Sequence, residues 1–350
     1  MKPSVLIETI KSLYEYSLAT GDHVVPFISG PPGIGKSACV HAAAAPDPVI
    51  DLRLVLLDPT DLRGLPHVDR EKNIARWSRP SFIPEADARG FIFYDEINAA
   101  PPVMQAAAYQ PIWDRCIGDH PIPKNIFQIA AGNGDKDRAV VNRLSTAMGS
   151  RLIHLDLEVD VQDWKQWAYK HDIRTEVIGF INAASSMLHK FNVDPNSKDG
   201  KSAFVDRTFP CPRTWEFVSK LLKANLPGEA LTEAVKGAVG EGAGLKFMSF
   251  MRFAAKAPDP EKIIKDPSSH PIPKEADVRY LTVSSLAARF DLKNASAILT
   301  YFDRWKDDAR EFPFIAVRDA LLRLGPAFSN ECESLRRWVL RPDNAKVISG

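Results

Sequence analysis

The glycine-rich segment from Gly30 to Ser37 constrains this chain more than any other stretch. It reads Gly-Pro-Pro-Gly-Ile-Gly-Lys-Ser and fits the pattern Gly-x-x-x-x-Gly-Lys-Ser/Thr. An apolar, β-branched run from Val24 to Ile28 precedes it, and an alanine-rich run that favours a helix follows it. A strand, a glycine loop and a helix N-terminus form a phosphate cradle, because the loop N–H groups and the helix dipole both attract an anion.

The residue types in this loop indicate binding of ATP and Mg²⁺. Lys36 is expected to reach the β- and γ-phosphates, and Ser37 to ligate the metal ion. An ordinary turn between strand and helix would not need a lysine and a hydroxyl in this register. The residues predicted to bind the nucleotide are Gly30, Pro31, Pro32, Gly33, Ile34, Gly35, Lys36, Ser37 and Ala38.

Polar residues follow two further apolar runs. The run Phe91–Tyr94 ends in Asp95 and Glu96, and the run from Ile126 ends just before Asn133. Because ligands bind at the carboxyl ends of strands in open α/β sheets, these side chains are expected beside the phosphate loop. Asp95 would hold Mg²⁺ through water and Glu96 would activate the attacking water. Asn133 could bond the γ-phosphate or that water, although Asn-Gly is also common in simple turns.

Composition limits the classes of function. The chain has 350 residues, enough for two or three domains, and its net charge of +1 gives no overall basic field for nucleic acid or an anionic membrane. The four cysteines have no Cys-x-x-Cys spacing, which favours reduced thiols and a cytoplasmic protein. We expect no membrane span and no signal peptide, since charged residues interrupt every long apolar run.

The periodicity predicts an α/β fold followed by helices. Five strand candidates with helices between them predict a parallel five-stranded sheet sandwiched by helices over residues 1–160. Beyond that point helical spacing predicts a helical lid over 161–244 and a helical C-terminal extension of unknown role over 245–350. Within these regions, 237–244 is expected to be a glycine-rich loop or hinge and 258–273 an extended connector.

The order of these landmarks resembles the AAA+ ATPases, and within them the MoxR-like group that includes the NorQ, CbbQ and GvpN proteins. The Walker A and Walker B motifs are the specific part of the resemblance, which covers about residues 20 to 225. The segments that match the family are Gly30–Ser37 (Walker A), Asp58–Gly64, Phe91–Glu96 (Walker B), Ala100–Gln105, Ala130–Asn133 (sensor 1), Leu144–Arg151 (arginine-finger segment) and Pro212–Arg213 (sensor 2).

The resemblance implies roles for three further residues. Asn133 would be sensor 1, Arg151 the finger that a neighbouring subunit supplies, and Arg213 sensor 2 at the start of a lid helix. The chain departs from the family where Gly134 replaces the usual proline and where Leu152 replaces the usual phenylalanine after the finger. Arg143 is therefore a rival for the finger role, or a second arginine acting in trans.

The resemblance also implies an assembly and an activity. AAA+ proteins usually form hexameric rings with ATP at the subunit interfaces, and the MoxR-like group is thought to remodel protein clients, often beside a partner with a von Willebrand factor A domain. One alternative is an AAA+ ATPase that acts on nucleic acid, as helicases and clamp loaders do; another is an assembly switch with little turnover. The residues that could form a local basic-aromatic patch for nucleic acid are Trp164, Lys165, Trp167, Lys170 and Lys190.

Overall fold

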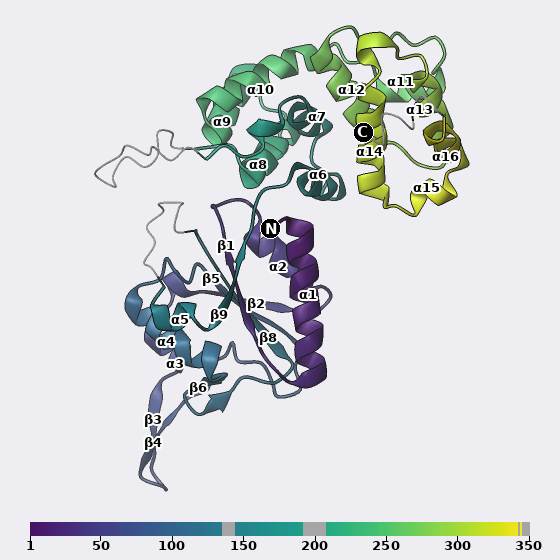
Figure 1. Cartoon of the computed structure of the whole chain (residues 1–350). Helices are drawn as coiled ribbons and strands as arrows, with labels where there is room; N and C mark the ends of the chain where they lie inside the picture. The colour runs from purple at the N-terminus through teal and green to yellow at the C-terminus, as the bar shows by residue number, and fades with distance from the viewer. Residues whose placement is uncertain (135–143, 192–207, 342–343, 345–350) are drawn as a thin grey trace. The chain divides into compact units, whose positions relative to one another are not determined.

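The chain is described by a computed structural model that covers residues 1–134, 144–191, 208–341 and 344. Its internal contacts divide it into two compact units (Figure 1). Among the described residues, the first is an α/β unit over 1–134 and 144–159, and the second is a helical unit over 160–191, 208–341 and 344. Within the described residues, no helix is both long enough and apolar enough to cross a membrane.

The α/β unit is built on one five-stranded sheet in which every pairing is parallel. The strand order is β2-β5-β8-β1-β9, so strands that follow one another in the sequence are not always neighbours. Because the strands are parallel, the carboxyl ends of β1, β5 and β8 lie at one edge of the sheet. The strands are β1 (Val25–Ser29), β2 (Val49–Arg53), β5 (Gly90–Asp95), β8 (Ile126–Gly132) and β9 (Leu152–Asp156).

Helices and two small hairpins complete this unit (Figure 1). The hairpin β3–β4 projects from the unit, and β6–β7 is a shorter one. The remaining elements are α1 (Pro3–Thr20), α2 (Lys36–Ala44), η1 (Leu54–Leu56), α3 (Pro59–Arg63), β3 (Pro66–Asp69), β4 (Ile74–Trp77), α4 (Pro102–Trp113), β6 (Cys116–Ile117), β7 (His120–Pro121) and α5 (Thr146–Gly149).

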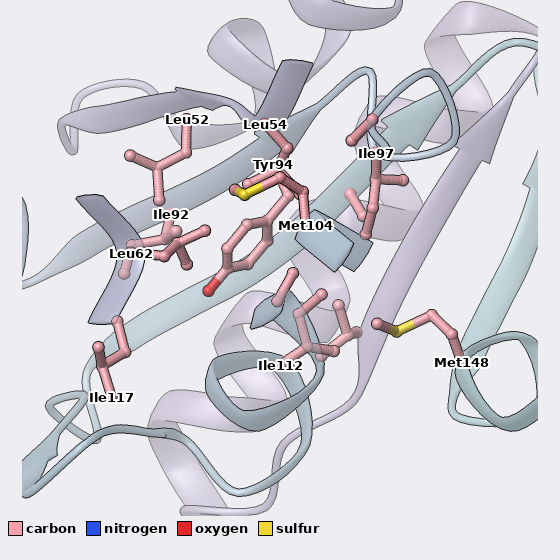
Figure 2. Close-up of a cluster of buried hydrophobic side chains, with 14 of the residues drawn as sticks. Leu52, Leu54, Leu62, Ile92, Tyr94, Ile97, Met104, Ile112, Ile117 and Met148 are labelled. Carbon is pink, nitrogen blue, oxygen red and sulfur yellow. The ribbon is translucent and has the colours of Figure 1, made fainter. Parts of the chain in front are cut away.

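Strand β5 shows how the apolar pattern produces two cores. Phe91 and Phe93 are buried in the cluster that includes residues of α1 and α2. Ile92 and Tyr94 point to the opposite face, into the cluster that includes Met104 of α4 (Figure 2). Successive side chains of a strand alternate between faces, so a continuous apolar run fits a strand that is covered on both sides.

The helical unit contains no strand in its described part. Helix α12 is central, since it packs against both α7 and α14. The helices are α6 (Val161–Lys170), α7 (Thr175–Ala183), η3 (Ser185–Met187), α8 (Pro212–Lys223), α9 (Gly228–Val239), α10 (Glu241–Ala254), α11 (Pro260–Lys265), α12 (Ala276–Ala288), α13 (Ala295–Phe302), η4 (Asp307–Ala309), α14 (Phe312–Leu324), α15 (Phe328–Glu331) and α16 (Glu333–Val339).

The predicted fold class is confirmed: a five-stranded parallel sheet between helices, followed by a helical region. The division at 160 and 244 into core, lid and extension stays a prediction. The prediction of a loop over 237–244 is wrong, because only Gly240, with φ of +83°, separates α9 from α10. The connector over 258–273 contains the short helix α11. Asp259 caps the N-terminus of this helix, because its side chain accepts the N–H of Glu261.

Candidate nucleotide-binding site

The phosphate loop joins β1 to α2 and depends on glycine at three positions. Gly30, Gly33 and Gly35 have φ of +150°, +78° and +104°, a region that other residues avoid. At Gly30 a side chain would also be obstructed, since a Cβ would lie 2.8 Å from the carbonyl oxygen of Leu157. Ile34, in the middle of the loop, is buried in the core beneath it and anchors the loop to the sheet.

Lys36 is the first residue of α2, and its ammonium group is held within the loop. Its Nζ donates to the carbonyl oxygens of Gly30 (2.5 Å) and Pro31 (3.0 Å). It also lies 3.3 Å from Oδ1 of Asn133, just beyond the end of β8. The structure therefore brings together the predicted lysine and the predicted sensor 1 residue, which are far apart in the sequence.

Ser37 and Asp95 are adjacent in space and suit a magnesium ion. The Ser37 hydroxyl donates to Oδ2 of Asp95 at 3.3 Å, and the aspartate is half-buried at the end of β5. A hydroxyl and a carboxylate are the hard oxygen ligands that Mg²⁺ uses beside nucleotide phosphates. These residues fit the metal ion and ATP that the sequence predicts.

Glu96 is exposed at the same edge and has an unusual backbone. Its φ is +55°, which is uncommon for a residue other than glycine and typically marks a functional or strained position. Its N–H donates to Oδ1 of Asp95 (3.0 Å), and its carbonyl accepts the N–H of Ala99 (2.9 Å). These bonds hold the segment in a conformation that leaves the Glu96 carboxylate facing solvent beside Asp95.

Asn98 is a site residue that the sequence analysis missed. It is buried, and its side chain bonds the backbone of Asn133 twice: Nδ2 donates to the carbonyl (2.6 Å) and Oδ1 accepts the N–H (3.1 Å). Gly132 makes room for it, since a Cβ there would lie 2.2 Å from Asn98 Oδ1. Asn98 therefore fixes Asn133 to the segment that carries Glu96. In the sequence, Asn98 is marked only as an asparagine two residues after Glu96, between Ile97 and Ala99.

Arg151 lies apart from this group, between α5 and β9. Its guanidinium carbon lies 4.7 Å from the ring centroids of both Tyr109 and Trp113 on α4. One guanidinium nitrogen donates to the carbonyl of Ala147 at 2.8 Å. These partners all belong to the same α/β unit and none is a phosphate-loop residue, which fits an arginine that does not serve its own loop.

The other predicted residues are in different positions. Arg213 is exposed in the first turn of α8, in the helical unit. Arg143 lies outside the described residues. Of the five residues named for a basic-aromatic patch, Lys170 and Lys190 are exposed and Trp167 is half-buried. Lys165 is fully buried, and its ammonium lies 2.5 Å from the Asp319 carboxylate. Trp164 is buried too, so neither side chain can contact nucleic acid.

Comparison with known proteins gives only distant structural similarity. No family model and no curated protein matches the chain. A mutant form of RuvB from Thermotoga maritima is similar, with 18% identity, 82% of each chain covered and a TM-score of 0.39. A DNA polymerase III gamma subunit-related protein from Thermotoga maritima shows 12% identity over 95% of this chain and 97% of that one, with a TM-score of 0.37. Sequence identities and TM-scores this low support no inference about function.

Fold and site together define the class of this protein. A parallel sheet carries a phosphate loop after β1, an Asp-Glu pair at the end of β5 and an asparagine after β8. At this edge Lys36 approaches Asn133 and Ser37 approaches Asp95. This is an α/β fold that carries a P-loop motif at one edge of a parallel sheet, followed by a helical region.

Proposed function

We propose that this chain is a MoxR-like AAA+ ATPase that hydrolyses ATP at the subunit interfaces of a ring, a hexamer in the usual case, and uses the energy to remodel or activate a protein client. A protein with a von Willebrand factor A domain is the proposed partner, and the cytoplasm the proposed compartment. One observation carries the ATPase proposal: Lys36, Ser37, Asp95 and Asn133 meet at the ends of three strands. The four free cysteines are compatible with a reducing compartment.

Each residue of the site has a role in this proposal. Residues 30–38 bind the phosphates through backbone N–H groups and Lys36, and Ser37 and Asp95 hold the metal ion. When bound, Mg²⁺ would neutralise charge on the phosphate oxygens. Glu96 would take a proton from the attacking water, and Asn133 would orient that water or the γ-phosphate.

Two arginines complete the proposal from outside the loop. Arg151 would act on the nucleotide of a neighbouring subunit, with Arg143 as its rival. Arg213 would sense the nucleotide from the start of α8. A finger arginine contributes roughly 10³–10⁵ in rate, so its loss should be as severe as the loss of the base.

The substitution Glu96→Gln tests the proposed hydrolysis. Phosphate release should fall by about 10²–10⁴-fold, the usual contribution of a general base, while binding of a fluorescent ATP analogue is retained. Glu71→Gln makes the same chemical change in the exposed β3–β4 turn and should leave turnover unchanged. Near-normal turnover in Glu96→Gln would remove Glu96 from the role of base.

Assembly of Glu96→Gln, measured together with phosphate release from wild-type protein, separates the ATPase ring from the assembly switch. Light scattering with and without Mg-ATP should show a nucleotide-dependent increase in mass to that of a ring. If wild-type protein assembles with ATP but releases no phosphate, the switch replaces the ATPase as the function. The nucleic-acid alternative is left with Trp167, Lys170 and Lys190 for its surface patch, since Lys165 and Trp164 are buried.

A further inference from the structure

Two aromatic side chains on α4 hold the predicted finger arginine. Tyr109 and Trp113 are four residues apart, so they lie on the same side of the helix. The guanidinium of Arg151 lies over both rings at 4.7 Å, a distance at which the ring quadrupole attracts a cation. Trp113 is 55% exposed although it is a large aromatic residue, so core packing alone does not explain its presence.

The backbone that carries Arg151 is fixed at both ends. Three residues before it, Met148 of α5 is buried in the core cluster with Ile112 of α4 (Figure 2). One residue after it, Leu152 begins β9 and pairs with Val25 of β1. The rings thus restrain the end of a side chain whose base is already rigid.

The two rings restrain the guanidinium, but the described hydrogen bonds use only part of its donor groups. Stacking engages its face, whereas its N–H groups point outward in its plane and stay suited to oxygen acceptors. One nitrogen donates to the Ala147 carbonyl. The Nε atom is buried and has no hydrogen-bond acceptor among the described residues. An arginine held in this way loses little freedom when it binds an anion, and restraint of this kind favours transition-state binding.

We propose that Tyr109 and Trp113 are positioning residues that preset Arg151 for contact with the nucleotide phosphates bound by a second copy of this chain. This inference rests on the proposed ATPase function. The phosphate loop of the same subunit does not depend on the two rings. Their loss should therefore lower turnover at the neighbouring site and leave nucleotide binding by the altered subunit unchanged.

The experiment compares turnover and binding in Trp113→Ala, Trp113→Phe and Val103→Ala. Trp113→Ala should lower the rate constant for phosphate release on the order of tenfold with unchanged affinity for the ATP analogue. Trp113→Phe keeps a ring and should restore most of the rate. Val103→Ala removes another exposed apolar side chain of α4 and should have no effect. Equal thermal unfolding of the three variants excludes a folding defect as the cause.

Mixing of subunits shows whether the effect acts in trans. Glu96→Gln subunits keep the arginine and the rings but lack the base, whereas Trp113→Ala subunits keep the base. A mixture should therefore be more active than the sum of the two proteins measured separately. A rate that falls in Trp113→Ala without recovery on mixing, or that does not fall at all, would overturn the positioning role. Absence of phosphate release from wild-type protein would instead overturn the proposed function, and this inference with it.

Discussion

Replacing Lys165 by methionine should destabilise the helical unit strongly. Lys165 on α6 and Asp319 on α14 form a fully buried ion pair, with Nζ 2.5 Å from Oδ1. Burial lowers the pKa of the Lys165 ammonium, although Asp319 opposes the shift. Methionine has a similar length but no charge, so the substitution leaves a buried carboxylate without its cation.

The neighbours of the pair set the expected magnitude. Tyr169 donates to the Asp319 carboxylate at 3.0 Å, and Asn182 donates to the same oxygen at 3.0 Å. These two bonds remain in the variant, but neither supplies a positive charge. Removing one partner of a buried pair costs about 3–5 kcal/mol, a large part of the roughly 5–15 kcal/mol by which domains are stable.

Urea unfolding followed by tryptophan fluorescence measures this loss. Five of the seven tryptophans lie in the helical unit, so the signal mainly reports that unit. Lys220→Met is the matched control, because Lys220 pairs with Glu216 on the exposed surface of α8, where ion pairs contribute little. The double substitution Lys165→Met with Asp319→Leu should recover part of the lost stability, since no unpaired charge remains.

The result that refutes this reasoning is a Lys165→Met variant no less stable than Lys220→Met. It would mean that the pair does not hold α6 to α14. The predicted lid, which begins with α6, and the predicted C-terminal extension, which contains α14, would then be less firmly joined than these contacts indicate. Limited proteolysis gives an independent reading, since cleavage between α6 and α14 should increase when the pair is broken.

Two further predictions concern helix packing and pH. Gly237→Ala should stabilise α9 by about 0.5–1 kcal/mol, because no atom lies near the added Cβ. Gly244→Ala should destabilise the packing of α9 against α10, because a Cβ would lie 2.8 Å from the Cα of Lys236. Thermal unfolding of the two variants measures both effects. Burial, with a contribution from Arg115, lowers the pKa of His23 below its usual 6.5, so unfolded chains bind a proton that folded chains do not. Stability should therefore fall as the pH drops through 6.5, and the dependence should weaken in His23→Gln; urea midpoints above and below that pH measure it.

Local features of the sequence were enough to predict the sheet and the phosphate loop. The run Phe91–Tyr94 is apolar at every position because both faces of β5 are covered. Such a run, ending in two acids, predicts a buried strand with carboxylates at its end, and no knowledge of tertiary contacts is needed. The glycine stretch 237–244 misled the same reasoning. Its glycines signal a loop in isolation, but here close packing of α9 against α10 requires a residue without a side chain at Gly244.

The residues that orient the site could not be predicted from the sequence, because each is explained only by a contact with a segment that is distant in the chain. Asn98 stands in no motif of the sequence. Its role is visible only in the structure, where β5 pairs with β8 and the Asn98 amide bonds the backbone of Asn133. The same holds for Gly132. No turn requires a glycine at this position, but the Asn98 side chain occupies the space that a Cβ would need. Tyr109 and Trp113 likewise gain a role only from the position of Arg151. The groups predicted to contact a nucleotide thus lie in short sequence motifs, whereas the groups that orient them depend on contacts that only the tertiary structure creates.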